Sequence, residues 1–240
     1  MKKAIFEVFN LTVGKITRLI QRTLVARNSP LGVFQLIDQH AFSDSAEYAI
    51  SNFSEAMQFD TRSELWSYCL KRIPQIESKK GLILEFGVWK GESINFFAKS
   101  CPKARVFGFD SFEGLEEDWH GFRLQKGHFS TKGKLPKCQS NVNLIAGWFE
   151  ETLPNFLKEI RLEQILFLHM DADTYKPTTY VLSSLAKNLS KGSIIVFDEY
   201  FGYSSWRLHE FKAWQETVTN SRIKYRYIAY TQTQVAIEIL

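Results

Sequence analysis

The stretch LILEFGVWKGES, residues 82–93, combines the patterns of a strand, a turn and a helix start. Its apolar first part, 82–86, is typical of a buried strand in a parallel sheet. Gly87 and Gly91 indicate a tight turn, and residues 93–98 begin a helix. A strand, a glycine turn and a helix N-terminus form the nucleotide crevice of open α/β sheets, so this part of the chain predicts such a crevice.

The residues inside the turn do not suit a dinucleotide. A G-x-G-x-x-G turn needs its second glycine because the backbone must approach a pyrophosphate, and here three larger residues, 88–90, stand between the glycines. Glu85, at the end of the strand, would repel a pyrophosphate but suits the ammonium and sulfonium groups of S-adenosylmethionine. We therefore expect that nucleoside to bind here. The competing interpretation is a turn with a purely structural role.

A second acid supports the prediction that a nucleoside binds here. Residues 105–110 form another apolar run, and it ends at Asp110, 19 residues after Gly91. Dinucleotide folds place an acid at about this distance to hold the ribose hydroxyls, and an adenosyl ribose makes the same demand. A third run, 143–146, precedes Trp148 and Phe149, either of which could lie against adenine or belong to the core.

Further strand patterns follow at 164–171 and 193–198, separated by helical segments. Residues 223–228 and 234–239 alternate with period two and predict a closing antiparallel pair. The fold class is therefore α/β. We expect a doubly wound, Rossmann-like, mostly parallel seven-stranded sheet with one antiparallel strand.

Two acidic doublets follow the fourth and fifth strands. Asp171 and Asp173 end one, and Asp198 and Glu199 end the other. Carboxylates gathered at one sheet edge repel one another unless a cation neutralises them, and an all-oxygen set suits Mg²⁺ or Ca²⁺. We assign Asp171, Asp198 and Glu199 to the metal and Asp173 to the general base. Each acid could instead be solvated or cap a helix.

Two histidines are alternative bases or metal ligands. His169 precedes the first acidic doublet, and His209 follows the second. A hydrogen-bonded structural role is the favoured interpretation of each. Metal bound to the acceptor oxygen would lower the pKa of its hydroxyl, and a carboxylate would then take the proton before in-line methyl transfer.

The N-terminal part predicts a helical extension, residues 1–59, before a methyltransferase domain at 60–240. Residues 1–27 have the pattern of a basic amphipathic helix, which could pack on its own domain, pack in a homo-oligomer, or contact an anionic membrane surface. Residues 28–32 interrupt it. A capping signal at 60–64 begins a further helix.

The composition of the chain excludes several classes of protein. The 240 residues are 45% hydrophobic, and the net charge of +4 is too small to indicate nucleic acid. Cys69, Cys101 and Cys138 form no C-x-x-C pair, so neither zinc nor a disulfide framework is expected. No apolar run reaches the roughly 18 residues of a membrane span. We expect a cytoplasmic protein, with peripheral contact to the inner membrane surface as the alternative.

Residues 119–149 contain no acid but several bases, among them Lys132 and Lys134. The glycines in this segment disfavour regular structure, and its place after a strand end is typical of a lid over a substrate. One hypothesis is that the segment favours an anionic small-molecule or glycan acceptor. The alternative is a solvated surface loop.

With these residues in place, the chain resembles the macrocin O-methyltransferase-like (TylF-like) family of class I S-adenosylmethionine-dependent methyltransferases. The resemblance covers roughly residues 60–240, and its matching stretches are 85–91, 107–115, 147–154, 169–175 and 197–201. It implies an O-methyltransferase that acts on sugar hydroxyls, with Mg²⁺ held by the acids of the last two stretches. Family members carry two aspartates where this chain has Asp198 and Glu199, and residues 1–60 have no counterpart, so the resemblance does not identify the acceptor.

The expected site therefore has three parts. The catalytic residues are Asp173 and Asp171, and the metal ligands are Asp171, Asp198 and Glu199. The expected cofactor-binding residues are Glu85, Gly87, Trp89, Gly91, Ser93, Asp110, Ser111, Phe112, Gly147, Trp148 and Phe149. The alternatives are a metal-independent methyltransferase, a non-catalytic S-adenosylmethionine-binding module tethered by its N-terminal helix and, least favoured, an NAD-dependent enzyme.

Overall fold

The computed structural model describes residues 32–73, 81–161 and 163–240. The chain divides into two compact units, residues 1–39 and 40–240. The first enters the described region only at residues 32–39, where α2 (Val33–Asn52) begins. The predicted amphipathic helix at 1–27 lies outside the described residues. Within them, no helix combines the length and the hydrophobicity that crossing a membrane requires.

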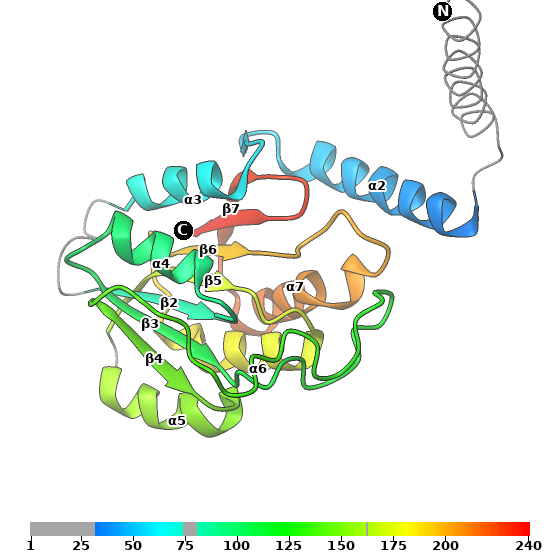
Figure 1. Cartoon of the computed structure of the whole chain (residues 1–240). Helices are drawn as coiled ribbons and strands as arrows, with labels where there is room; N and C mark the ends of the chain where they lie inside the picture. Colours follow the sequence, from blue (N-terminus) through cyan, green and yellow to red (C-terminus); the bar gives the residue numbers. More distant parts are fainter. Residues whose placement is uncertain (1–31, 74–80, 162) are drawn as a thin grey trace, which may run out of the picture. The chain divides into compact units, whose positions relative to one another are not determined.

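An eight-stranded sheet with the order β1-β7-β8-β6-β5-β2-β3-β4 forms the centre of the second unit (Figure 1). Of its strands, β8 is antiparallel to both neighbours, and the other pairs described are parallel. The strands are β1 (Met57–Gln58), β2 (Leu82–Phe86), β3 (Arg105–Asp110), β4 (Val142–Ala146), β5 (Ile165–Met170), β6 (Ile194–Phe197), β7 (Tyr225–Tyr230) and β8 (Val235–Ile239).

The predicted doubly wound sheet with one antiparallel strand is confirmed, but the predicted count of seven strands is wrong by one. The additional strand is β1, whose two residues pair in parallel with β7. Two residues are too few to show an alternating pattern in the sequence. The predicted boundary at residue 60 stays a prediction, although β1, just before it, is part of the sheet.

Helices cover both faces of the sheet (Figure 1). One face carries α3 (Arg62–Lys71) and α4 (Glu92–Ser100), and the other carries α5 (Phe149–Ile160), α6 (Tyr175–Leu185) and α7 (Glu210–Ser221). Two short 3₁₀ helices, η1 (Ala186–Asn188) and η2 (Trp206–Leu208), complete the described elements. Successive side chains of a strand point to opposite faces, so Ile83 and Leu84 of β2 belong to different cores.

The helix predicted after the capping signal is α3. Thr61 is its N-cap, and its side chain accepts a hydrogen bond from the main chain of Glu64, whose carboxylate in turn accepts one from the main chain of Thr61. This reciprocal pair satisfies two main-chain donors that would otherwise have no partner at the helix start. It also places Arg62, the first residue of the helix, beside the end of β6, where its guanidinium contacts Asp198.

The strand register brings the expected site residues to one edge of the sheet. The pairing of neighbouring strands continues one residue past their ends, because Gly87 donates a main-chain hydrogen bond to Phe109 (2.9 Å) and Asp171 donates one to Phe86 (2.8 Å). A Cβ atom at Gly87, whose φ is +96°, would overlap the carbonyl oxygen of Asp171. The glycine therefore lets the turn after β2 lie directly against the end of β5.

Residues 111–141 connect β3 to β4 without helix or strand, as the sequence predicts, and are called the β3–β4 segment below. Internal main-chain hydrogen bonds hold the segment together, including one from Leu115 to His128 (2.9 Å). Two further bonds fasten it to the chain before α7. The hydroxyl of Ser204 donates to the carbonyl of Gly121 (2.8 Å), and the ring of His209 donates to the carbonyl of His120 (3.0 Å).

Candidate active site

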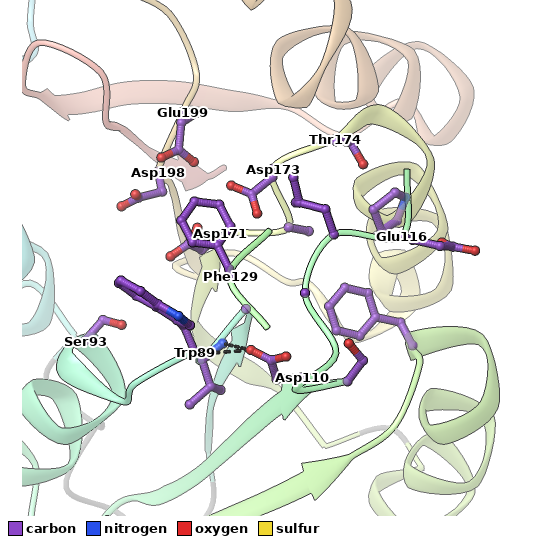
Figure 2. Close-up of a pocket in the computed structure, with 18 of the residues that line it drawn as sticks. Trp89, Ser93, Asp110, Glu116, Phe129, Asp171, Asp173, Thr174, Asp198 and Glu199 are labelled. Carbon is purple, nitrogen blue, oxygen red and sulfur yellow. Dashed lines mark hydrogen bonds between the residues drawn. The ribbon is translucent and has the colours of Figure 1, made fainter. Parts of the chain in front are cut away.

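A cavity of about 440 Å³ opens at the carboxyl edge of the sheet (Figure 2). Its wall combines the turn between β2 and α4, the end of β3, the start of α5, the loop between β5 and α6, and the end of β6. Arg62 of α3 and Phe129 of the β3–β4 segment also line it. This is the edge at which open α/β sheets bind their ligands.

Asp110 organises one side of this cavity. Its Oδ2 atom accepts hydrogen bonds from the main-chain N–H groups of Val88 (2.8 Å) and Trp89 (2.7 Å) (Figure 2), and its Oδ1 atom accepts one from the main-chain N–H group of Phe112 (2.6 Å). A carboxylate has about four lone-pair positions, so the main chain occupies three. Asp110 therefore shapes the glycine turn itself and keeps capacity for about one further donor, such as a ribose hydroxyl.

Most of the expected cofactor-binding residues line the cavity, and four do not. Phe112 lies in the core, only 1% exposed, while Gly91 and Gly147 shape turns behind the wall. Glu85 is the fourth. The residues that do line it are Gly87, Trp89, Ser93, Asp110, Ser111, Trp148 and Phe149.

Glu85 is fully buried and paired with a histidine from the neighbouring strand. Its Oε1 atom lies 2.9 Å from Nδ1 of His169, whose Nε2 atom lies 3.5 Å from Asp198. Burial lowers the pKa of His169, but the two carboxylates outweigh it and raise that pKa to about 9. His169 is therefore held as a cation between two acids, which agrees with the structural role favoured from the sequence.

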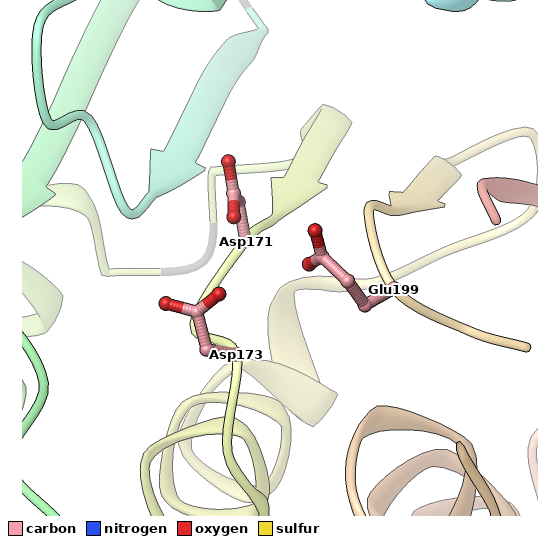
Figure 3. Close-up of side chains that lie close together, drawn as sticks. All are labelled: Asp171, Asp173 and Glu199. Carbon is pink, nitrogen blue, oxygen red and sulfur yellow. The ribbon is translucent and has the colours of Figure 1, made fainter. Parts of the chain in front are cut away.

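Three of the predicted acids converge. One carboxylate oxygen from each of Asp171, Asp173 and Glu199 lies within 4.8 Å of the other two (Figure 3). Burial, followed by the negative charge of Asp198, raises the pKa of each well above its usual range. We call these three residues the acid group.

Asp198 is not part of the acid group, which differs from the predicted ligand set. Its carboxylate contacts Nη1 of Arg62 (3.0 Å), Nε2 of Gln234 and the ring of His169. Burial alone would raise the pKa of Asp198, but His169 and Arg62 hold it well below its usual range. Asp173, from the loop between β5 and α6, takes the place predicted for Asp198 beside Asp171 and Glu199.

Some expected groups do not line the cavity, and one that was not expected, Arg62, does. His209 is 4% exposed, bonds to His120 and does not line the cavity. None of the bases of residues 119–149 lines it either, so the anionic acceptor predicted from them stays a prediction. The sequence motifs did not identify Arg62 or the buried Glu210 as site residues. Arg62 stands inside the capping signal at 60–64, which predicted only a helix start, and Glu210 belongs to no motif.

A doubly wound sheet with one reversed strand, a glycine turn held by an acid of the next strand and a cavity at that edge define the class I methyltransferase fold. Residues 84–200 match the family described as a methyltransferase domain. The family resemblance predicted from the motifs is confirmed.

A curated relative agrees with this assignment. The chain is 28% identical to mycinamicin III 3''-O-methyltransferase of Micromonospora griseorubida over 148 residues, which are 50% of this chain and 55% of the relative. The chain thus matches little more than half the length of that protein.

Solved structures share the fold. The calicheamicin methyltransferase CalS11 is 23% identical, with a TM-score of 0.59 over 92% of this chain and 91% of its own. The O-methyltransferase NovP is 18% identical, with a TM-score of 0.53 over 85% and 97%.

Proposed function

We propose that this protein transfers a methyl group from S-adenosylmethionine to a hydroxyl of a sugar or glycosylated metabolite, assisted by Mg²⁺. One observation carries the proposal: the turn held by Asp110 and the acid group line the same cavity of a methyltransferase domain. The curated relative is named a mycinamicin III 3''-O-methyltransferase, which supports a hydroxyl acceptor, and CalS11 is named a TDP-rhamnose 3'-O-methyltransferase, which supports a sugar.

The donor would occupy the side of the cavity formed by the glycine turn. The carboxylate of Asp110 would accept a hydrogen bond from the ribose with its remaining lone pair, and the aromatic rings of Trp148 and Phe149 would flank the base. Glu85 does not line this side, so its negative charge would act on the donor only through the surrounding protein. The acids of the cavity wall suit a ligand that carries a positive sulfonium.

The residues at the other side fit a divalent cation. The acid group offers only carboxylate oxygens, and Oε2 of Glu199 is buried without a hydrogen-bond partner among the described residues. The raised pKa values of all three acids mean that these carboxylates lack compensating positive charge. Oxygen ligands of this kind suit Mg²⁺. When bound, such an ion lowers the pKa of an acceptor hydroxyl.

Asp173 is the proposed general base. Its raised pKa lets the carboxylate hold a proton taken from the acceptor, and its backbone is held at a φ of +60°, which non-glycine residues rarely adopt. Asp171 and Glu199 lie beside it and would position the acceptor oxygen for in-line attack on the methyl carbon. The contact with His169 (3.5 Å) helps to lower the pKa of Asp198, so Asp198 would not compete with Asp173 for the proton of the acceptor.

The proposal is tested with the purified chain, methyl-labelled S-adenosylmethionine and a panel of nucleotide sugars together with glycosylated metabolites. TDP-rhamnose is a suitable first acceptor, because CalS11 is named a TDP-rhamnose 3'-O-methyltransferase. We expect labelled product that disappears with EDTA and returns with Mg²⁺. Transfer that is unaffected by EDTA and by Glu199→Gln would favour the metal-independent alternative, and tight donor binding without transfer to any acceptor would favour the binding module.

A further inference from the structure

We propose that Glu210 is a positioning residue that holds Glu199 in the orientation needed to bind the cation. This inference rests on the proposed function. Glu210 is the first residue of α7, is 0% exposed and belongs to none of the motifs identified in the sequence. Its Oε2 atom accepts a hydrogen bond from the main-chain N–H of Glu199 (3.1 Å).

The main chain of Glu199 is held on both sides. Glu210 binds its N–H group, and the hydroxyl of Tyr203 donates to its carbonyl oxygen (3.2 Å). The residue that follows, Tyr200, is fixed by a main-chain hydrogen bond to Thr233 (3.0 Å). The main chain around Glu199 is therefore fixed, while Oε2 of its carboxylate has no partner among the described residues. A ligand held in this way is oriented before the cation arrives.

The burial of Glu210 favours this role over a purely structural one. A fully buried carboxylate beside the acid group is costly, and its Oε1 atom has no hydrogen-bond partner in the described part of the chain. The position at the start of α7 compensates part of that cost, since an acid is favourable at a helix N-terminus. The bond to Glu199 is the contact through which Glu210 reaches the acid group.

The test compares Glu210→Gln with Glu210→Met in the full chain. Both side chains are uncharged and close in size to glutamate, but only glutamine keeps an oxygen that accepts the N–H of Glu199. The probe is Mn²⁺, added to EDTA-treated protein, and free Mn²⁺ is measured by electron paramagnetic resonance. We expect Glu210→Met to raise the Mn²⁺ Kd about 10-fold or more and Glu210→Gln to raise it less than about threefold.

A double-mutant cycle shows whether the effect passes through Glu199. In a Glu199→Gln background, Glu210→Met should change the Mn²⁺ Kd little further. Equal losses for Glu210→Gln and Glu210→Met would overturn the positioning role in favour of a charge effect, and so would an unchanged Kd for a Glu210→Met protein that melts cooperatively. Wild-type protein that binds no Mn²⁺ would overturn the proposed metal site together with this inference. Failure of the positioning role alone would leave Mn²⁺ binding by the wild type intact, so the two failures can be distinguished.

Discussion

Two aspartates that follow adjacent strands are held in opposite electrostatic environments. Asp171, after β5, lies with two other acids, whereas Asp198, after β6, contacts Arg62, His169 and Gln234. The pKa of the first is raised by burial and by neighbouring acids, and the pKa of the second is lowered by its cationic neighbours despite burial. The ionised form of Asp171 therefore opposes folding in the absence of a cation, and that of Asp198 favours it.

Replacing each aspartate by asparagine should separate these roles. In EDTA at neutral pH, Asp171→Asn removes a repelled charge and should stabilise the fold by about 1 kcal/mol. Asp198→Asn removes one partner of a buried charge network and should destabilise it by about 3–5 kcal/mol. Thermal and urea unfolding measure both changes. A destabilised Asp171→Asn protein, or an Asp198→Asn protein as stable as wild type, would contradict the assignment.

His209 should make the fold sensitive to mild acid. Its Nε2 atom donates to the carbonyl of His120, and its Nδ1 atom is buried without a described partner. Burial lowers the pKa of His209 below its ordinary value, although the bond to His120 opposes this. Neutral His209 therefore contributes fully to stability above a pH of about 6.5, and this contribution is lost as the pH falls through the pKa of His209 in the folded protein.

The matched variant is His209→Gln, whose amide can still donate to His120 but does not titrate. We expect the advantage of wild type over His209→Gln in melting temperature to shrink as the pH is lowered from about 7.5 to 5.5. An advantage that stays constant or grows would show that protonation of His209 does not weaken the fold.

At the residue scale, the sequence predicted which acids follow the strand ends, but it did not predict that Glu85 is buried against His169 instead of lining the cavity. Asp110 was found from its distance to Gly91, because a strand end and a glycine turn leave a clear spacing. The exchange of Asp173 for Asp198 in the acid group could not be predicted. Two partners of Asp198, Arg62 of α3 and Gln234 just before β8, lie far away in the sequence, and no local pattern indicates such contacts.

At the scale of elements, the β3–β4 segment depends on one close contact. Gly121 has a φ of +84°, and a Cβ there would overlap Ser205, next to the residue that fastens the segment. Gly127 has a similar φ of +81° with open space around it. Substitution of either glycine would therefore cause similar backbone strain, and only a side chain at position 121 would also overlap a neighbouring residue.

Gly121→Ala should therefore loosen the segment more than Gly127→Ala. Both changes cost about 1–2 kcal/mol of backbone strain, and the first adds about 1–3 kcal/mol for overpacking. We expect faster trypsin cleavage between β3 and β4 in Gly121→Ala, with lower methyl transfer. Equal cleavage of the two variants would show that the contact with Ser205 does not hold the segment.

Elements with a periodic hydrophobic pattern or a capping signal in the sequence were predicted, and those that depend only on contacts with distant residues were not. The final antiparallel pair was predicted because β7 and β8 alternate, and α3 because Thr61 and Glu64 cap it. The short β1 was missed because only its pairing with β7 makes it a strand. Tertiary contacts, rather than local preference, decide such short elements.

At the scale of the whole molecule, binding of the proposed donor or its product should raise the free energy of unfolding. The reaction product S-adenosylhomocysteine at about 100 times its Kd should raise the free energy of unfolding by about 2.7 kcal/mol. Asp110→Asn should abolish most of that rise, because an amide cannot accept all three main-chain hydrogen bonds. Glu159→Gln, a change at an exposed residue of α5, is the control and should keep it. A full rise in the Asp110→Asn protein would exclude Asp110 from the donor site.

The bonds of Asp110 have a consequence for repeated turnover. Three main-chain hydrogen bonds engage its carboxylate, so the protein's own atoms fix the shape of the glycine turn. Little conformational entropy then has to be given up on each binding event. Under the proposed function, the product would leave and fresh donor would enter a turn whose shape stays the same from one cycle to the next.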